Sequence, residues 1–294
     1  MKIQTFRGEK GYAVFKISLA VLGTVLLACH ANAQAVVDPT LSNGGSTATV
    51  NLEGGPGLIG MDNWSVNNGE GMQNQLDQQW FWFSVNGGSV ESIDQIGGLT
   101  YNVSADDSTL YATYENAELS VGIVYSLDGL GPGQADLSET ISITNNMASG
   151  AFNINFYQYS NFNLLQNSAN NINVVGSPGS YSSIVQYTTG DGNGIEETID
   201  QPFADFAEAG STNTVLHDVA TGATLSGNPV AGPGDVAWAF EWTTNIASGD
   251  SLDIYKDKDL SIQPVPEPTD VAWLAMGLGV FGLVRTAWKR NKLT

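Results

Sequence analysis

The side chains that carry most nucleophilic and metal chemistry are scarce in this chain. Its 294 residues include one cysteine, Cys29, and two histidines, His30 and His217. A cysteine nucleophile, a Ser-His-Asp triad or a His-based zinc site needs these residues in groups. His217 lies beside Asp218 in the run "TVLHDV", and in a strand the two side chains would point to opposite faces. The pattern therefore favours a structural role for His217.

Carboxylates are the abundant chemistry-bearing groups. Glycoside hydrolysis uses two of them, about 5–5.5 Å or about 6.5–9.5 Å apart. Two acids stand next to aromatic runs: Asp77 precedes "QQWFWF", and Glu241 lies in "WAFEWTT". A solvated surface acid is the alternative interpretation of each. The sequence selects no pair.

A weak calcium candidate lies in "DGNGIEE", which offers Asp191, Asn193 and Glu196 as oxygen ligands. The segment fails as an EF-hand loop because Ile195 occupies a ligand position and Pro202 is the twelfth residue. We expect either no cofactor or Ca²⁺ held by clustered carboxylates.

The aromatic run "WFWF" places Trp80 and Trp82 on one face of a strand and Phe81 and Phe83 on the other. A strand that is apolar on both faces is most simply a central strand, buried on both sides. Exposed Trp80 and Trp82 would instead form a stacking platform for sugar rings. We favour the buried strand and keep the platform as the alternative.

The elements that position these residues are predicted to be strands. Short alternating or β-branched runs are separated by Gly, Asn and Asp, as in strands joined by turns. The expected strands span residues 47–52, 79–85, 99–104, 109–114, 118–127, 139–145, 152–160, 181–189, 213–219, 236–244 and 251–256. This spacing predicts an all-β fold, an antiparallel β-sandwich of one lobe or of two sub-lobes that meet near 163–180 or 190–212.

The charge of the middle of the chain is one-sided. Residues 36–262 contain 27 acids and two bases, Lys256 and Lys258, which gives a net charge of −25. Such a field repels phosphate backbones, so we expect no nucleic-acid partner. Acidic exported proteins use this charge for solubility and for holding divalent cations.

The N-terminus has the features of a secretory signal peptide over residues 1–35. Basic residues precede the apolar run 17–28, and "ANAQA" offers small residues for cleavage after Ala33. "LLAC" resembles a lipobox, and lipidation of Cys29 is the alternative. Residues 36–262 are then the exported domain.

The C-terminal segment, residues 263–294, contains a short apolar run, 271–284. Extended to residues 269–288, a helix would reach about 30 Å, the thickness of the hydrocarbon core. Bases from Arg285 onward place the C-terminus on the cytoplasmic side. We expect a short transmembrane helix.

This tail resembles the PEP-CTERM sorting signal of Gram-negative bacteria. The box is Val265, Pro266, Glu267 and Pro268, the apolar span follows, and bases begin at Arg285. Asp270 interrupts the start of the span, and the bases do not form an arginine run. The resemblance implies an exosortase-type membrane protease as partner, a transient membrane anchor, and delivery to the cell surface or the extracellular matrix. It also implies an association with exopolysaccharide and biofilm.

Two functions are consistent with these features. The first is a non-enzymatic structural or interaction role of an exported surface or matrix protein in the exopolysaccharide layer. The second is a carbohydrate-binding or glycan-active β-sandwich that uses acidic and aromatic residues. Burial of Trp80 and Trp82 discriminates between them, because a stacking platform has to be exposed.

Overall fold

The computed structural model describes residues 38–53, 59–166, 169–190 and 192–263. The predicted signal peptide, the sorting motif, the apolar tail and Asp191 lie outside these residues. Across the described residues, no helix has the length and apolarity needed to span a membrane.

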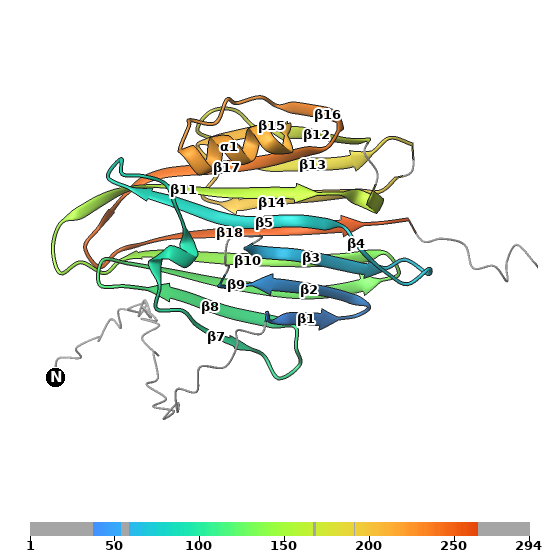
Figure 1. Ribbon diagram of the computed structural model, residues 1–294, viewed down its shortest axis with the longest axis horizontal. Coiled ribbons are helices and arrows are strands. Elements are labelled where there is room, and N and C mark those ends of the chain that lie inside the picture. Colours follow the sequence, from blue (N-terminus) through green and yellow to red (C-terminus); the bar gives the residue numbers. More distant parts are fainter. Residues whose placement is uncertain (1–37, 54–58, 167–168, 191, 264–294) are drawn as a thin grey trace, which may run out of the picture. The chain divides into compact units, whose positions relative to one another are not determined.

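The described chain folds into two antiparallel sheets (Figure 1). In spatial order, the first consists of β1 (Thr40–Asn43), β2 (Ser46–Asn51), β3 (Gly60–Asn67), β5 (Leu76–Val85), β11 (Ala151–Phe162), β17 (Val236–Ala247) and β15 (Phe206–Ser211). Two short strands join it: β4 (Met72–Asn74) pairs with β3, and β6 (Glu91–Ser92) pairs with β5.

The second sheet has nine strands. Their spatial order is β16 (Val230–Gly234), β12 (Asn170–Val175), β13 (Ser183–Thr188), β14 (Gly194–Gln201), β18 (Ser251–Ser261), β10 (Gln134–Asn145), β9 (Leu119–Gly131), β8 (Thr109–Glu115) and β7 (Thr100–Val103). Its central strands alternate between buried and partly or fully exposed residues, as β10 shows from Gln134 to Asn145. This alternation means that one face of the second sheet covers the core and the other faces water.

The central strands of the first sheet are buried on both faces. The run from Gln78 to Ser84 in β5 is buried throughout, and so is the run from Phe156 to Phe162 in β11. One face packs against the second sheet. Helix α1 (Thr212–Thr221) contacts β11, β15 and β17, and covers part of the other face. The predicted antiparallel β-sandwich is therefore confirmed for the described residues.

The predicted strand 213–219 is wrong, because these residues form helix α1. Ser211 caps the helix by accepting a hydrogen bond from the Thr214 backbone N–H, and Gly222 ends it in the left-handed conformation at φ +70°. Val215 and Val219, four residues apart, are its buried positions. His217 is exposed on this helix rather than part of a buried strand. The apolar residues of "TVLHDV" fit a spacing of four as well as an alternation of two, and the caps decided between them.

The segments near 163–180 and 190–212, which were the candidate boundaries between two sub-lobes, contain strands of the two sheets. β12 and β14 lie within the second sheet, and β15 extends the first sheet beside β17. The described residues belong to one compact unit and do not form two sub-lobes at these loops. Sequence patterning missed β12, β14 and β15 because glycine, asparagine and acids interrupt their apolar alternation.

The two sheets approach closely where the β1–β2 turn meets β9. Gly44 has φ +52°, and a Cβ atom placed on it would lie 2.2 Å from the Gly129 carbonyl oxygen. The Ser42 backbone N–H donates to the Asp107 carbonyl at 2.8 Å across the same junction. Glycine at both positions therefore permits a backbone contact between the sheets that any side chain would prevent.

Candidate functional site

The aromatic strand β5 is covered on both sides. Trp80 is fully buried, and its indole N–H donates to the Ser92 hydroxyl at 2.7 Å. Trp82 is 9% exposed and meets the ring of Tyr159 edge-on, with ring centroids 6.2 Å apart. On the opposite face, Phe81 is buried as well. The structure agrees with a central buried strand, so a stacking surface for sugars has to be sought away from Trp80 and Trp82.

The two acids singled out beside aromatic runs lie apart. On neighbouring strands of the first sheet, Glu241 of β17 lies opposite Tyr157 of β11, and Tyr157 lies opposite Trp82 of β5. Trp82 is five residues from Asp77, a separation along the strand of about 16 Å. Burial raises the pKa of Glu241, and partial burial also raises the pKa of Asp77. Their separation exceeds the spacing of either class of glycosidase carboxylates.

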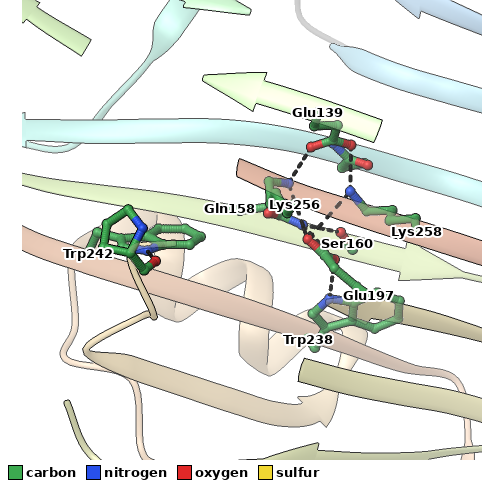
Figure 2. A network of polar contacts seen from close by, with 10 residues as sticks. Glu139, Gln158, Ser160, Glu197, Trp238, Trp242, Lys256 and Lys258 are labelled. Atoms are coloured by element: carbon green, nitrogen blue, oxygen red, sulfur yellow. Dashed lines mark hydrogen bonds and ion pairs between the residues drawn. The ribbon is translucent and has the colours of Figure 1, made fainter. Parts of the chain in front are cut away.

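A buried ion network lies between the sheets and consists of Glu139, Glu197, Lys256 and Lys258 (Figure 2). Strand β18 lies between β10 and β14, so its two lysines have a carboxylate on each side. Glu139 is the register partner of Lys256, and Glu197 is the partner of Lys258. All four side chains are completely buried.

The four charges contact one another directly. The ammonium of Lys258 lies 2.5 Å from Glu139 and 3.4 Å from Glu197. The ammonium of Lys256 lies 3.1 Å from Glu197, also bonds Glu139, and stands 5.2 Å from the centre of the Phe81 ring. Two positive and two negative groups leave the ion network neutral overall.

The opposite sheet supplies the remaining hydrogen bonds of the ion network. The Gln79 amide donates to Glu139 at 2.8 Å, and the Gln158 amide donates to Glu197 at 2.6 Å. The indole N–H of Trp238 also donates to Glu197, at 3.0 Å, and Ser160 accepts from Gln158 at 3.0 Å. These bonds join the two sheets at the middle of the core (Figure 2).

The electrostatics hold the ion network in its charged form. Burial alone would raise the pKa of Glu197, but Lys256, Lys258 and the donors Gln158 and Trp238 outweigh it and lower the pKa to about 2. Burial would likewise lower the pKa of Lys258, yet the two carboxylates raise it, whereas for Lys256 burial outweighs the carboxylates and lowers the pKa. Charges that are sealed from water and fully paired cannot meet a substrate. We assign the ion network a structural role.

Period-two alternation could have identified the buried lysines from the sequence. In "SLDIYKDKDLS", Ile254, Lys256, Lys258 and Leu260 share one face, and Asp253, Tyr255, Asp257 and Asp259 share the other. Strand β18 buries the first set and leaves the second partly or fully exposed. The alternation alone does not predict buried lysines, because lysine is rarely fully buried without a partner. The partners of Lys256 and Lys258 come from β10 and β14.

The candidate functional site is a cavity of about 280 Å³ at one end of the sandwich, which we call the end cavity. It lies where β5 ends and where β9 and β11 begin, and segments from both sheets contribute to it. Its lining consists of Phe83, Val85, Asn86, Gly88, Ser89, Glu91, Gln95, Ile96, Asn116, Glu118, Leu119, Met147 and Phe152.

The end cavity combines an apolar floor with a polar rim. Val85 and Met147 form the partly exposed apolar floor, and the rings of Phe83 and Phe152 and the side chain of Leu119 are buried beneath it. The rim carries two amides, Asn116 and Gln95, and two carboxylates, from Glu91 and Glu118, all exposed. These residues come from five separate segments of the chain, and no sequence motif connects them. Sequence reasoning therefore missed the end cavity, although "WFWF" supplies its first ring.

Hydrogen bonds from side chains to the backbone fix the loops that carry the rim. The Asn116 side-chain oxygen accepts from the backbone N–H groups of Glu118 and Leu119, each at 2.9 Å. Across the cavity, the Asn86 side-chain oxygen accepts from the Asn153 backbone N–H at 3.0 Å. Among the described residues, the side chains of Glu91 and Glu118 line the cavity and are exposed to water.

The calcium candidates are separated from the end cavity. Asn193 is buried, and its side-chain oxygen accepts from the Gln263 backbone N–H at 2.7 Å. Glu196 is exposed on β14, and Asp191 lies outside the described residues. In the part of the chain that the structure describes, three or more His, Cys, Asp or Glu side chains nowhere gather closely enough to hold a metal ion. Calcium binding stays a prediction.

Comparison with known proteins identifies the fold class. The sequence matches no protein-family model and no curated protein. Among solved structures, a bacterial glucoamylase complexed with acarbose is similar at a TM-score of 0.51 and 9% identity; the match covers 82% of this chain and 36% of that one. A galactose mutarotase-like protein from Lactobacillus casei aligns at 0.45 and 12% identity, over 76% and 100% of the chains.

The glucoamylase match establishes a shared β-sandwich fold and no shared activity, because the identity is only 9%. This chain spans about a third of that enzyme's length. Function has to be argued from the end cavity and from the surface around it.

Proposed function

We propose that this chain is an exported surface or matrix protein that binds a glycan in the end cavity without cleaving it. The composition of the end cavity is the observation that carries the proposal. Sugar rings are bound by apolar or aromatic surfaces under their C–H faces and by planar amide and carboxylate groups at their hydroxyls. The partly exposed apolar side chains of Val85 and Met147 and the rim of Asn116, Gln95 and Glu118 supply both.

The placement of the acids supports binding over hydrolysis. A glycosidase acid retains its proton at neutral pH because it lies in an apolar environment. Glu91 and Glu118 are exposed at the rim, where water solvates them. The deeply placed carboxylates of Glu139 and Glu197 are held as counterions by lysines. A role in holding or organising a polysaccharide requires no reacting pair.

The proposed location rests on the two ends of the sequence. A signal peptide with cleavage after Ala33 leads to export, and a tail with the Val265–Pro268 box leads to recognition by an exosortase-type protease. The expected product is a protein that has lost both ends. Intact-mass analysis of the protein from cell-surface and extracellular fractions tests this. A protein that still ends at Thr294 in wild-type cells contradicts tail processing, and a lipidated Cys29 contradicts cleavage after Ala33.

Glycan binding is tested with a blocked cavity. Ser89 lines the end cavity and is exposed, so Ser89→Trp places an indole in it without disturbing the core. We expect the full chain to bind polysaccharide isolated from the producing cells and Ser89→Trp to lose at least tenfold in affinity. Ser42→Trp, at an exposed position of the edge strand β1, is the matched control and should bind normally. Equal binding by both variants contradicts the proposed site.

A further inference from the structure

The surface around the end cavity lacks the groups that bind anions. Lys256 and Lys258 are the two bases of residues 36–262, and the structure seals both side chains in the ion network. Recognition of a carboxylate, sulfate or phosphate group relies on Arg or Lys. Over the described surface, no lysine or arginine is left for this purpose.

The rim of the end cavity carries charge of the opposite kind. Glu91 and Glu118 both line it and both are exposed. An anionic sugar in the cavity would stand close to these two carboxylates, and like charges at an exposed rim repel one another, most strongly at low salt. A hydroxyl-rich sugar avoids this cost, because carboxylates accept hydrogen bonds from hydroxyl groups.

The floor of the end cavity fits the apolar side of a sugar ring. Val85 and Met147 are partly exposed and offer carbon surfaces, and the polar side chains of Asn116, Gln95, Glu91 and Glu118 line the same cavity. A ring that presents C–H groups downward and hydroxyls outward satisfies both regions. A ring that carries an ionised group would have to leave it unpaired.

We infer that the glycan recognised in the end cavity carries no carboxylate, sulfate or phosphate groups, so that this protein selects uncharged regions of an extracellular polysaccharide. The inference rests on the proposed glycan binding and adds the charge class of the ligand. Selection would come from repulsion of charged sugars as much as from attraction of neutral ones.

Matched polymers test the charge class. Polygalacturonate and its carboxyl-reduced form have the same backbone and differ in charge, and uncharged glucan and mannan extend the neutral set. With the full chain and a chelator that removes divalent cations, we expect at least one neutral polymer to bind and polygalacturonate to bind at least tenfold more weakly than its reduced form. Tighter binding of the acidic form overturns the inference.

A double variant should change the binding of neutral and acidic glycans in opposite directions, which a merely structural role of the two acids would not do. Glu91→Gln with Glu118→Gln removes the rim charges and keeps the size of the side chains. We expect about tenfold weaker binding of the neutral glycan, because charged acceptors form the stronger hydrogen bonds, and stronger binding of polygalacturonate. Glu115→Gln, an exposed acid outside the lining, is the control and should change neither.

The possible failures are distinguishable. If no polymer binds, charged or neutral, the proposed glycan binding itself is contradicted. If neutral and acidic polymers bind equally and the double variant changes neither, glycan binding stands but the inference of charge class is overturned.

Discussion

Glu197 shows how a single buried residue can govern this sandwich. Its carboxylate receives hydrogen bonds from Gln158 and Trp238 on one sheet and ion pairs from Lys256 and Lys258 on the other. Removing one member of a buried, paired set of charges is costly, because its partners stay in a medium that solvates them poorly. The ion network therefore holds the sheets in one alignment and tolerates few replacements.

The first prediction concerns Glu197→Gln, which keeps the shape of the side chain and removes its charge. Lys256 and Lys258 would then share one carboxylate, so we expect the free energy of unfolding to fall by about 3–5 kcal/mol. Urea denaturation at pH 7 measures this. Glu115→Gln changes an exposed acid of β8 that lies opposite Ser120 and should alter stability by less than about 0.5 kcal/mol. Equal effects of the two variants would contradict a structural role of the ion network.

The ion network also has a defined pH dependence. The folded-state pKa of Glu197 is about 2, below its ordinary value of 4.5. A lowered pKa contributes stability that is present above pH 4.5 and is lost as pH falls toward 2. The wild-type advantage over Glu197→Gln should therefore shrink across that window.

At the scale of elements, the water-facing side of the second sheet carries a row of acids. Asp136 of β10 lies opposite Asp128 of β9 and opposite Asp259 of β18, and Asp259 lies opposite Glu196 of β14. Like charges directly opposite one another destabilise a sheet. Partial burial, together with Asp257, Asp259 and Asp128, raises the pKa of Asp136 to about 6.

The second prediction is that Asp136→Asn stabilises the protein at high pH. The raised pKa means that the folded protein favours the protonated form of Asp136. The stability that this protonation contributes is complete below about pH 4 and is lost as pH rises through about 6. At pH 8 the variant should be more stable by about 0.5–1 kcal/mol, and at pH 4 the difference should vanish. Thermal melting across this range measures it.

The control for this variant is Asp253→Asn, on the neighbouring strand β18 and the same face of the sheet. Asp253 is exposed and lies opposite Ser142 rather than another acid. Its replacement should give little gain at either pH. If Asp253→Asn matched Asp136→Asn at pH 8, the effect would arise from net charge rather than from the row.

At the scale of the whole molecule, the surface is strongly anionic. The two lysines are neutralised in the core, so they do not offset the acids of the surface. Residues 36–262 contain 27 acids, and Glu139 and Glu197 are the two that the lysines neutralise. The remaining acids repel one another across the surface. Such a charge keeps a protein soluble and weakens its compact state.

The third prediction is that salt stabilises this protein. Raising NaCl from 10 to 300 mM shortens the screening length from about 30 Å to below 10 Å. Weaker repulsion should raise the melting temperature by about 3 °C, since about 1 kcal/mol corresponds to about 2–4 °C for a domain of this size. A melting temperature that falls with NaCl would show that attractive surface pairs dominate.

The calcium expectation is tested in the same measurement. CaCl₂ and NaCl are compared at equal ionic strength, with a chelator in the second sample. Specific binding of Ca²⁺ to the folded state should raise the melting temperature beyond the effect of NaCl. Equal melting in both samples would remove calcium as a ligand of residues 36–262.

The sequence by itself determined the strands whose side chains alternate, because the period of two is a local property of the chain. β2, β8, β9, β10 and β18 follow from it, whereas β5, β11 and β17 follow from continuous apolar and aromatic runs such as "WFWF", which predict strands buried on both faces. The helix at 212–221 did not, because a short apolar run fits both periods and the caps at Ser211 and Gly222 decide.

Only the tertiary structure decided which residues meet. Lys256 could be placed on the core face of a strand from its neighbours, but its counterions are more than fifty residues away and depend on the order β14, β18, β10. The end cavity likewise draws its floor and rim from segments that strand pairing and loop closure bring together. Alternation along one strand carries no information about the order of strands in a sheet, so contacts between strands are decided by the packing of the whole core.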